Sequence, residues 1–104
     1  MAIVQVTIVP LGTGSPSVGE YVAEVYRELE QSAVSGRISY QLTPMSTIIE
    51  GELDELLALV RRMHEVPFAS GAARVSTTLT IDDRRDKQGT MEQKLLSVEE
   101  KLRR

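Results

Sequence analysis

The order in which two hydrophobic periodicities alternate along the chain restricts its fold more than any other feature. Apolar residues at every second position predict strands, and apolar residues three or four positions apart predict helices. Strand-like alternation covers residues 3–9, 38–42, 43–52 and 73–82, and helix-like spacing covers 17–34, 53–63 and 90–103. Two right-handed strand-helix-strand units interleave in this order. We therefore expect an α+β fold, a ferredoxin-like βαββαβ split sheet with an extra C-terminal helix at about 90–103.

Each predicted helix carries one apolar stripe that we expect to face a packed surface. The stripes are Val18, Val22, Val25 and Leu29, then Leu53, Leu56, Leu57, Val60 and Met63, then Met91, Leu95, Val98 and Leu102. Capping boxes at Ser17 with Glu20 and at Thr90 with Gln93 predict the starts of the first and third helices. We expect Pro10 to end the first strand, and an irregular segment to follow the second helix up to Gly71.

Chain length and composition exclude several classes of protein. A chain of 104 residues suits one domain, 1–104, with a single core. A net charge of −3 argues against a nucleic-acid partner. There is no cysteine, which excludes disulfides, thiolate metal sites and cysteine nucleophiles. Neither a signal peptide nor an apolar stretch long enough to span a membrane is evident, so we expect no membrane partner and a cytoplasmic location.

The predicted sheet has one face without helices, and its composition indicates self-association. If the strand alternation holds, this open face carries Thr7, Gln41, Thr43, Ser76, Thr78 and Thr80. A polar but β-branched face is suited to packing on a second sheet with hydroxyl groups bonding across. A domain this small also has little core left for a third helix, whereas a second subunit offers a surface. We expect a homodimer or homotetramer.

The residues offer little for catalysis. The glycine loop at 12–15 lacks the third glycine of a dinucleotide loop and the lysine of a P-loop, so we interpret it as a turn and helix cap. The single histidine, His64, excludes a histidine-rich metal site and makes a Ser-His-Asp hydrolase unfavourable. An acylphosphatase-type hydrolase would need an arginine in residues 10–16, which contain none. We expect no catalytic residue, metal site or cofactor.

The segment TPMSTIIEGE at 43–52 ends a predicted central strand with Glu50, directly after two isoleucines. A carboxylate that is partly removed from water needs a partner, and the candidates are Arg74, a backbone N–H group or a cationic ligand. The alternative is a glutamate at the strand end that is solvated by water. The sequence alone does not determine which face of the sheet carries Glu50. Tyr21, beside the glycine loop, is either a packing residue or a platform for a flat ligand.

Several short motifs together resemble the thiamine-binding protein family, a small ferredoxin-like family related to the YkoF proteins. The resemblance covers nearly the whole chain, with one departure at Ser46, where the family has glycine. The motifs are PLGTG at 10–14 with Ser17, YV at 21–22, TPM at 43–45 with Thr47, IEG at 49–51, HE at 64–65, RV at 74–75, IDDRRD at 81–86, and TME at 90–92 with Lys94.

This resemblance implies non-catalytic binding of thiamine or of its hydroxymethylpyrimidine-like portion by dimers or tetramers. A positively charged thiazolium and a flat aminopyrimidine call for a carboxylate, hydroxyl groups and an apolar or aromatic wall. We therefore expect the carboxylate of Glu50, hydroxyl groups from Ser15, Ser17, Thr43, Ser46 and Thr47, and walls from Tyr21 and Met45. The alternative function is a structural or regulatory oligomeric module that binds a different small ligand.

Overall fold

The structure, a computed structural model, describes residues 1–12, 19–86 and 91–103, and the side chains of residues 19–21 and 91 are not described. The described residues form an α+β fold in the predicted order, so the fold prediction is confirmed. Its elements are β1 (Ala2–Leu11), α1 (Gly19–Ala33), β2 (Ser39–Leu42), β3 (Thr47–Gly51), α2 (Leu53–Ala69), β4 (Arg74–Asp83) and α3 (Met91–Leu102).

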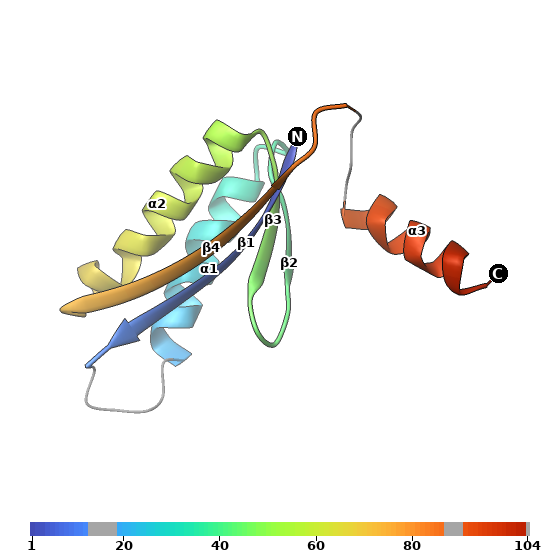
Figure 1. Cartoon of the computed structure of the whole chain (residues 1–104). Helices are drawn as coiled ribbons and strands as arrows, with labels where there is room; N and C mark the ends of the chain where they lie inside the picture. The colour runs from blue at the N-terminus through green and yellow to red at the C-terminus, as the bar shows by residue number, and fades with distance from the viewer. Residues whose placement is uncertain (13–18, 87–90, 104) are drawn as a thin grey trace.

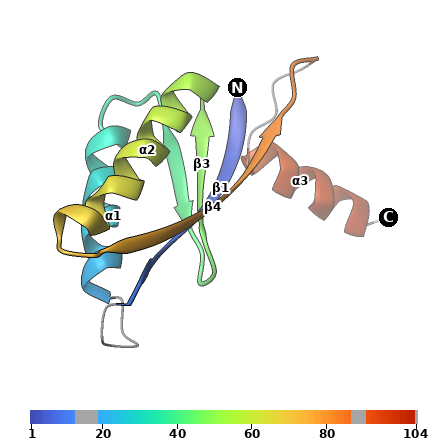
Figure 2. The ribbon, with the colours of Figure 1, turned by 60° about the vertical axis from the view of Figure 1, so that its left-hand side comes forward.

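The four strands form one antiparallel sheet in the order β2-β3-β1-β4. Helices α1 and α2 lie side by side on one face of this sheet, and none of the described helices packs across the other face (Figures 1 and 2). Helix α1 contacts β2, and α2 contacts β1, β3 and β4. The sheet therefore has a helix face and an open face, as the sequence predicts.

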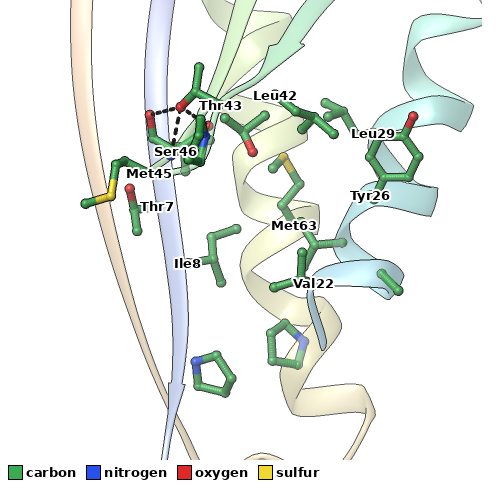
Figure 3. Close-up of a pocket in the computed structure, with 17 residues that line it drawn as sticks. Thr7, Ile8, Val22, Tyr26, Leu29, Leu42, Thr43, Met45, Ser46 and Met63 are labelled. Atoms are coloured by element: carbon green, nitrogen blue, oxygen red, sulfur yellow. Dashed lines mark hydrogen bonds between the residues drawn. The ribbon is translucent and has the colours of Figure 1, made fainter. Parts of the chain in front are cut away.

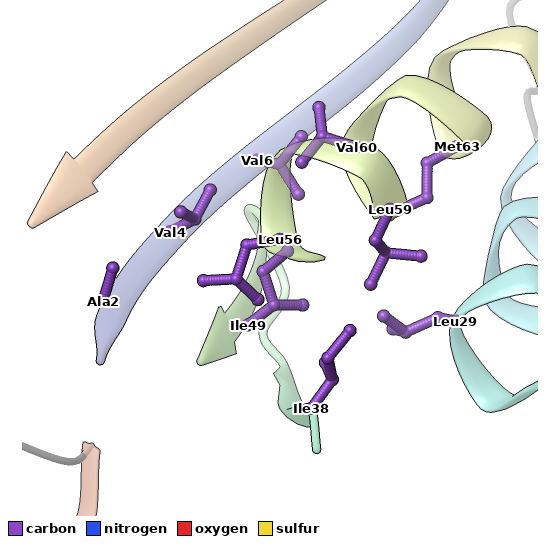
Figure 4. Close-up of a cluster of buried hydrophobic side chains, with 10 residues drawn as sticks. All are labelled: Ala2, Val4, Val6, Leu29, Ile38, Ile49, Leu56, Leu59, Val60 and Met63. Carbon is purple, nitrogen blue, oxygen red and sulfur yellow. The ribbon is translucent and has the colours of Figure 1, made fainter. Parts of the chain in front are cut away.

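The core lies between the sheet and the two helices. Alternate residues of β1, together with Ile49 of β3, meet apolar residues of α1 and α2 (Figure 4). Burying one large aliphatic side chain contributes roughly 1.5–3 kcal/mol, so this cluster is a main source of stability. Its members are Ala2, Val4, Val6, Leu29, Ile38, Ile49, Leu56, Leu59, Val60 and Met63.

The helix stripes predicted from spacing are partly wrong. Leu57 is 38% exposed, whereas Leu59, which lies outside the predicted stripe, is fully buried. In α1, Leu29 is buried but Val22 is largely exposed. The reason is packing, because α2 lies against both the sheet and α1, and this turns its buried face toward Leu59. Val18 lies outside the described residues.

Two elements continue through a proline, beyond the ends that the sequence predicts. β1 continues through Pro10 to Leu11, and α2 continues through Pro67 to Ala69, so both predicted ends are wrong. From Thr7 onward β1 pairs only with β4, so this part of β1 has one unpaired edge. Pro10, which has no amide hydrogen, is tolerated there as prolines are on edge strands. In α2 the ring of Pro67 is packed in the interior, less than 2% exposed.

The strand register settles which face carries Glu50. Directly opposed residues of antiparallel strands point to the same face. Ile49 pairs with Val4 and is buried under the helices, so its neighbour Glu50, which pairs with Ile3 and Ser39, points to the open face. Arg74 pairs with Leu11, eight positions farther along β1, which corresponds to about 27 Å at about 3.4 Å per residue. Within one chain, Arg74 is therefore not the partner of Glu50.

Helix α3 projects away from the sheet and the other helices in both views (Figures 1 and 2). Its apolar residues Leu95, Leu96, Val98 and Leu102 are all more than half exposed. The radius of gyration, 15.3 Å, exceeds the roughly 13 Å of a compact chain of this length. Helix α3 is thus amphipathic but does not bury its apolar side against its own domain.

Candidate functional site

A mismatch in strand length leaves an opening in the helix face of the sheet. β1 has ten residues but pairs with β3 only from Ala2 to Val6, because the hairpin formed by β2 and β3 turns back at residues 43–46. No strand in the described part of the chain pairs with this edge of β1 beyond Val6. Thr7, Ile8 and Pro10 therefore border a space that reaches toward α1 and α2.

This space is a cavity of about 460 Å³, a size typical of small-molecule sites. Figure 3 shows the hairpin turn on one side, Tyr26, Leu29 and Val22 of α1 on the other, and Met63 of α2 between them. None of the described lining residues carries a formal charge. They are Val6, Thr7, Ile8, Pro10, Val22, Ala23, Val25, Tyr26, Leu29, Leu42, Thr43, Pro44, Met45, Ser46, Thr47, Met63 and Pro67.

The hairpin turn is held by the hydroxyl group of Thr43. The Thr43 Oγ1 hydroxyl donates to the carbonyl oxygen of Ser46 at 2.8 Å and accepts from the Ser46 backbone N–H at 3.1 Å. The Thr43 backbone N–H also donates to the Ser46 carbonyl, at 2.9 Å. Because its only proton is used in the turn, Thr43 builds the cavity wall rather than offering a free donor to a ligand. The Ser46 hydroxyl lies 3.4 Å from Thr43 Oγ1.

Tyr26 supplies the aromatic part of the cavity wall. Its ring meets the ring of Tyr40 edge to face, with centroids 6.1 Å apart. A hydrogen bond to Tyr40, supported by Glu30, raises the pKa of Tyr26 above its ordinary range. The ring of Tyr26 borders the cavity.

The structure brings together one part of the predicted ligand-binding set. Thr43, Met45, Ser46 and Thr47 all line the cavity, with Met45 at its rim, 84% exposed. Glu50 does not line it, because Glu50 lies on the opposite face of the sheet. Tyr21 is in α1, but its side chain is not described. Ser15 and Ser17 lie outside the described residues.

Sequence reasoning missed the cavity residues contributed by the helices. Tyr26 follows Val22 by four positions, a spacing that places both on one face of α1, and both line the cavity. That spacing was a usable signal. Met63 and Pro67 gave no such signal, because the helix predicted from the sequence ends before the proline.

The remaining candidates lie away from the cavity lining. His64 is half buried, with Nδ1 2.6 Å from Thr77 Oγ1 and its ring against Phe68. In the described residues, no group of three His, Asp or Glu side chains is placed to hold a metal ion. Within the same residues, every helix is too short or too polar to cross a membrane.

Curated relatives match almost the full length of the chain. The UPF0045 protein YqgV of Bacillus subtilis is 54% identical over 102 residues, which cover 98% of each chain. A UPF0045 protein of Methanothermobacter thermautotrophicus is 40% identical over 103 residues, covering 98% of this chain and 100% of the relative. Neither name states an activity.

Solved structures support the fold. The hypothetical protein MJ1052 of Methanocaldococcus jannaschii superposes with a TM-score of 0.81 at 32% identity, covering 95% of this chain and 96% of that one. A putative thiamine biosynthesis/salvage protein of Thermotoga maritima superposes with a TM-score of 0.73 at 22% identity, covering 93% and 97% of the two chains. At that identity the second likeness concerns the fold alone.

A protein-family model also matches most of the chain. The model described as thiamine-binding protein matches residues 4–99, which include every described residue of the cavity wall. The match spans most of the chain, and it agrees with the family that the sequence motifs resemble. The chain therefore belongs to the thiamine-binding protein family.

Proposed function

We propose that this protein binds thiamine, or a related hydroxymethylpyrimidine-like ligand, in the cavity between α1, α2 and the hairpin turn, and that it catalyses no reaction. The observation that carries the proposal is the composition of the wall. A cavity of about 460 Å³ is lined by apolar, aromatic and hydroxyl-bearing residues, among them the family motif at 43–47. Such a wall is suited to a flat, uncharged heteroaromatic ring that needs a few polar contacts.

The charge of thiamine then determines how it lies. Since none of the described lining residues is charged, the aminopyrimidine enters the cavity and the thiazolium cation stays at the mouth, in contact with water. Glu50 points to the open face, on the opposite side of the sheet from the cavity, so it cannot contact a cation inside the cavity of its own chain. A role of Glu50 in cation recognition would need a ligand on the open face, and the experiment below tests it.

We further propose that the working form is a cytoplasmic homodimer or homotetramer. Of the six residues expected on the open face, the register turns Thr7, Gln41, Ser76, Thr78 and Thr80 toward it, and this composition suits a second sheet. The sixth, Thr43, lies in the hairpin turn and lines the cavity instead. The exposed apolar stripe of α3 supports the same conclusion, because an amphipathic helix in water buries such a stripe against a partner surface.

Titration calorimetry tests the ligand. We expect thiamine and hydroxymethylpyrimidine to bind the wild-type chain with similar affinity, because both present the same ring to the cavity. Replacing Ala23, which lines the cavity, in the variant Ala23→Phe should fill the cavity and abolish the heat for both compounds. The matched control is Glu50→Gln, which leaves the cavity lining unchanged and should bind as the wild type does.

The outcomes separate the alternatives. Absence of heat with thiamine, hydroxymethylpyrimidine and thiamine diphosphate would end the thiamine proposal and favour a module with a different ligand. Loss of thiamine binding in Glu50→Gln, with hydroxymethylpyrimidine binding retained, would instead place the cation beside Glu50.

A further inference from the structure

The edge of β1 that borders the cavity has no strand partner beyond Val6 in the described part of the chain. Thr7 and Ile8 point to opposite faces of the sheet, yet both line the cavity (Figure 3). The cavity therefore reaches the edge of the strand itself, where main-chain N–H and C=O groups lie in the plane of the sheet. The hydrogen-bonding pattern of the sheet determines which of these groups face the cavity.

The hairpin formed by β2 and β3 reveals this pattern. In an antiparallel pair of strands, opposed residues alternate between pairs that exchange main-chain hydrogen bonds and pairs that do not. Thr43 donates its N–H to the carbonyl oxygen of Ser46, so the next opposed pair, Leu42 and Thr47, exchanges none. The main-chain groups of Thr47 are thus directed away from β2 and toward its partner in β1, Val6.

The same pattern continues along β1, because every second residue of a strand directs its N–H and C=O groups to the same edge. Val6 directs them to β3, so Ile8 directs its own to that edge two residues farther along, where β3 has ended. Pro10 comes next in this series, and its missing N–H falls on the unpaired edge, so no hydrogen bond to β4 is lost. The hairpin and the proline independently indicate the same orientation.

Ile8 therefore presents a donor and an acceptor side by side at the cavity. Among the described residues, no main-chain hydrogen bond outside the helices and the strand ladders involves Ile8. Ile8 is only half buried, so water can solvate its N–H and C=O groups in the free protein. A ligand that displaces this water has to replace both of its hydrogen bonds.

We propose that the main-chain N–H and C=O groups of Ile8 form two adjacent hydrogen bonds with the ligand. This assigns the cavity to flat rings in which an acceptor lies next to a donor, such as a ring nitrogen beside an amino group. The inference rests on the proposed function and makes it more specific, because a ring that lacks either group leaves one main-chain group of Ile8 without a partner. Selectivity then comes from the free edge of a strand.

Hydrogen exchange of single amides, followed by NMR, tests the wild-type protein with 4-amino-5-hydroxymethyl-2-methylpyrimidine as the probe. Without the probe, the Ile8 amide should exchange at least about tenfold faster than those of Thr7 and Val9, which donate to β4 and serve as internal controls. Once calorimetry shows that the probe is bound, exchange at Ile8 should slow to about the rate of its neighbours.

The outcomes of this experiment are distinguishable. An Ile8 amide that is as protected as its neighbours in the free protein, or that bound probe leaves unchanged, would overturn the inference while leaving the proposed function standing. Absence of probe binding would overturn both.

A matched pair of ligands tests the acceptor. The second probe is the same pyrimidine without its amino group, which leaves the Ile8 carbonyl oxygen without a donor. We expect it to bind about five- to tenfold more weakly, the range of one neutral hydrogen bond in a partly buried site. Equal affinities of the two compounds would contradict the pairing with Ile8.

A matched pair of variants tests the donor. Proline and valine are similar in size, but only valine keeps the main-chain N–H. Because this N–H faces no strand, Ile8→Pro should fold, as the strand already tolerates Pro10. We expect Ile8→Pro to bind the amino compound about five- to tenfold more weakly than Ile8→Val does. Folded variants with equal affinities would show that the Ile8 N–H has no part in binding.

Discussion

At the scale of single residues, Thr43 shows that a motif residue can shape a cavity wall through hydrogen bonds to the backbone. Its hydroxyl group makes two hydrogen bonds to the backbone of Ser46 and so sets the shape of the turn that walls the cavity. Residue chemistry alone predicts Thr43 as a hydroxyl that contacts the ligand. The structure gives it a positioning role, because its proton is already in use.

This role predicts a difference between two conservative substitutions. Thr43→Val keeps the shape but removes the hydroxyl, and should lower the free energy of unfolding by about 1–2 kcal/mol and weaken ligand binding. Thr43→Ser keeps the hydroxyl and should retain most of both. Urea unfolding and calorimetry measure the two effects, and equal behaviour of the two variants would show that the turn does not need this hydrogen bond.

Two neighbouring leucines of α2 provide a second test at this scale. Leu59 is fully buried in the core, whereas Leu57 is 38% exposed. Leu59→Ala should therefore cost about 2–5 kcal/mol of unfolding free energy, and Leu57→Ala should cost less than about 1 kcal/mol. The substitutions are chemically identical, so urea midpoints that moved by the same amount would contradict the assigned face of α2.

At the scale of elements, α3 forms a helix that its own domain does not stabilise by packing. Most helical stability in proteins comes from burying an amphipathic face, and short isolated helices are marginal in water. Helix α3 has twelve residues, and its apolar side chains stay exposed within one chain. In the oligomer that we propose, a second subunit would bury them.

A pair of adjacent positions on α3 tests this. Val98 belongs to the apolar stripe, and Ser97 lies about 100° around the helix from it, outside that stripe. Val98→Glu should raise the concentration at which the oligomer dissociates by about tenfold or more, because a carboxylate would enter an apolar contact. Ser97→Glu adds the same charge and should leave the molar mass unchanged in light scattering. Identical masses for both variants at all concentrations would exclude α3 from the interface.

At the scale of the whole molecule, two features distinguish the faces of the sheet. One is the difference in length between β1 and β3, and the other is the register in which β1 pairs with its neighbours. The short hairpin leaves the edge of β1 unpaired and opens the cavity on the helix face. The register sends the threonine-rich set and Glu50 to the open face. In the proposed function, ligand binding and self-association therefore use opposite sides of one sheet.

This separation predicts that the two activities can be disrupted independently. Thr78→Lys places a charge on the open face, at the middle of β4, and should reduce the oligomer to a smaller species, with the cavity lining left intact. Ala69→Lys adds the same charge at the exposed end of α2 and should not change the mass. Analytical ultracentrifugation checks both, and an oligomer that tolerates Thr78→Lys would contradict packing through the open face.

Local signals in the sequence are enough to predict the order of elements, the ferredoxin-like topology and the motif at 43–47 that lines the cavity, because hydrophobic periodicity and turn residues act over a few positions. The remaining features needed the folded chain. The face of Glu50 depends on pairing with Ile3, and the burial of Leu59 depends on how α2 packs. The place of Pro67 in the cavity wall depends on a helix that continues through this proline. Each of these follows from contacts between distant segments, which local patterns do not encode.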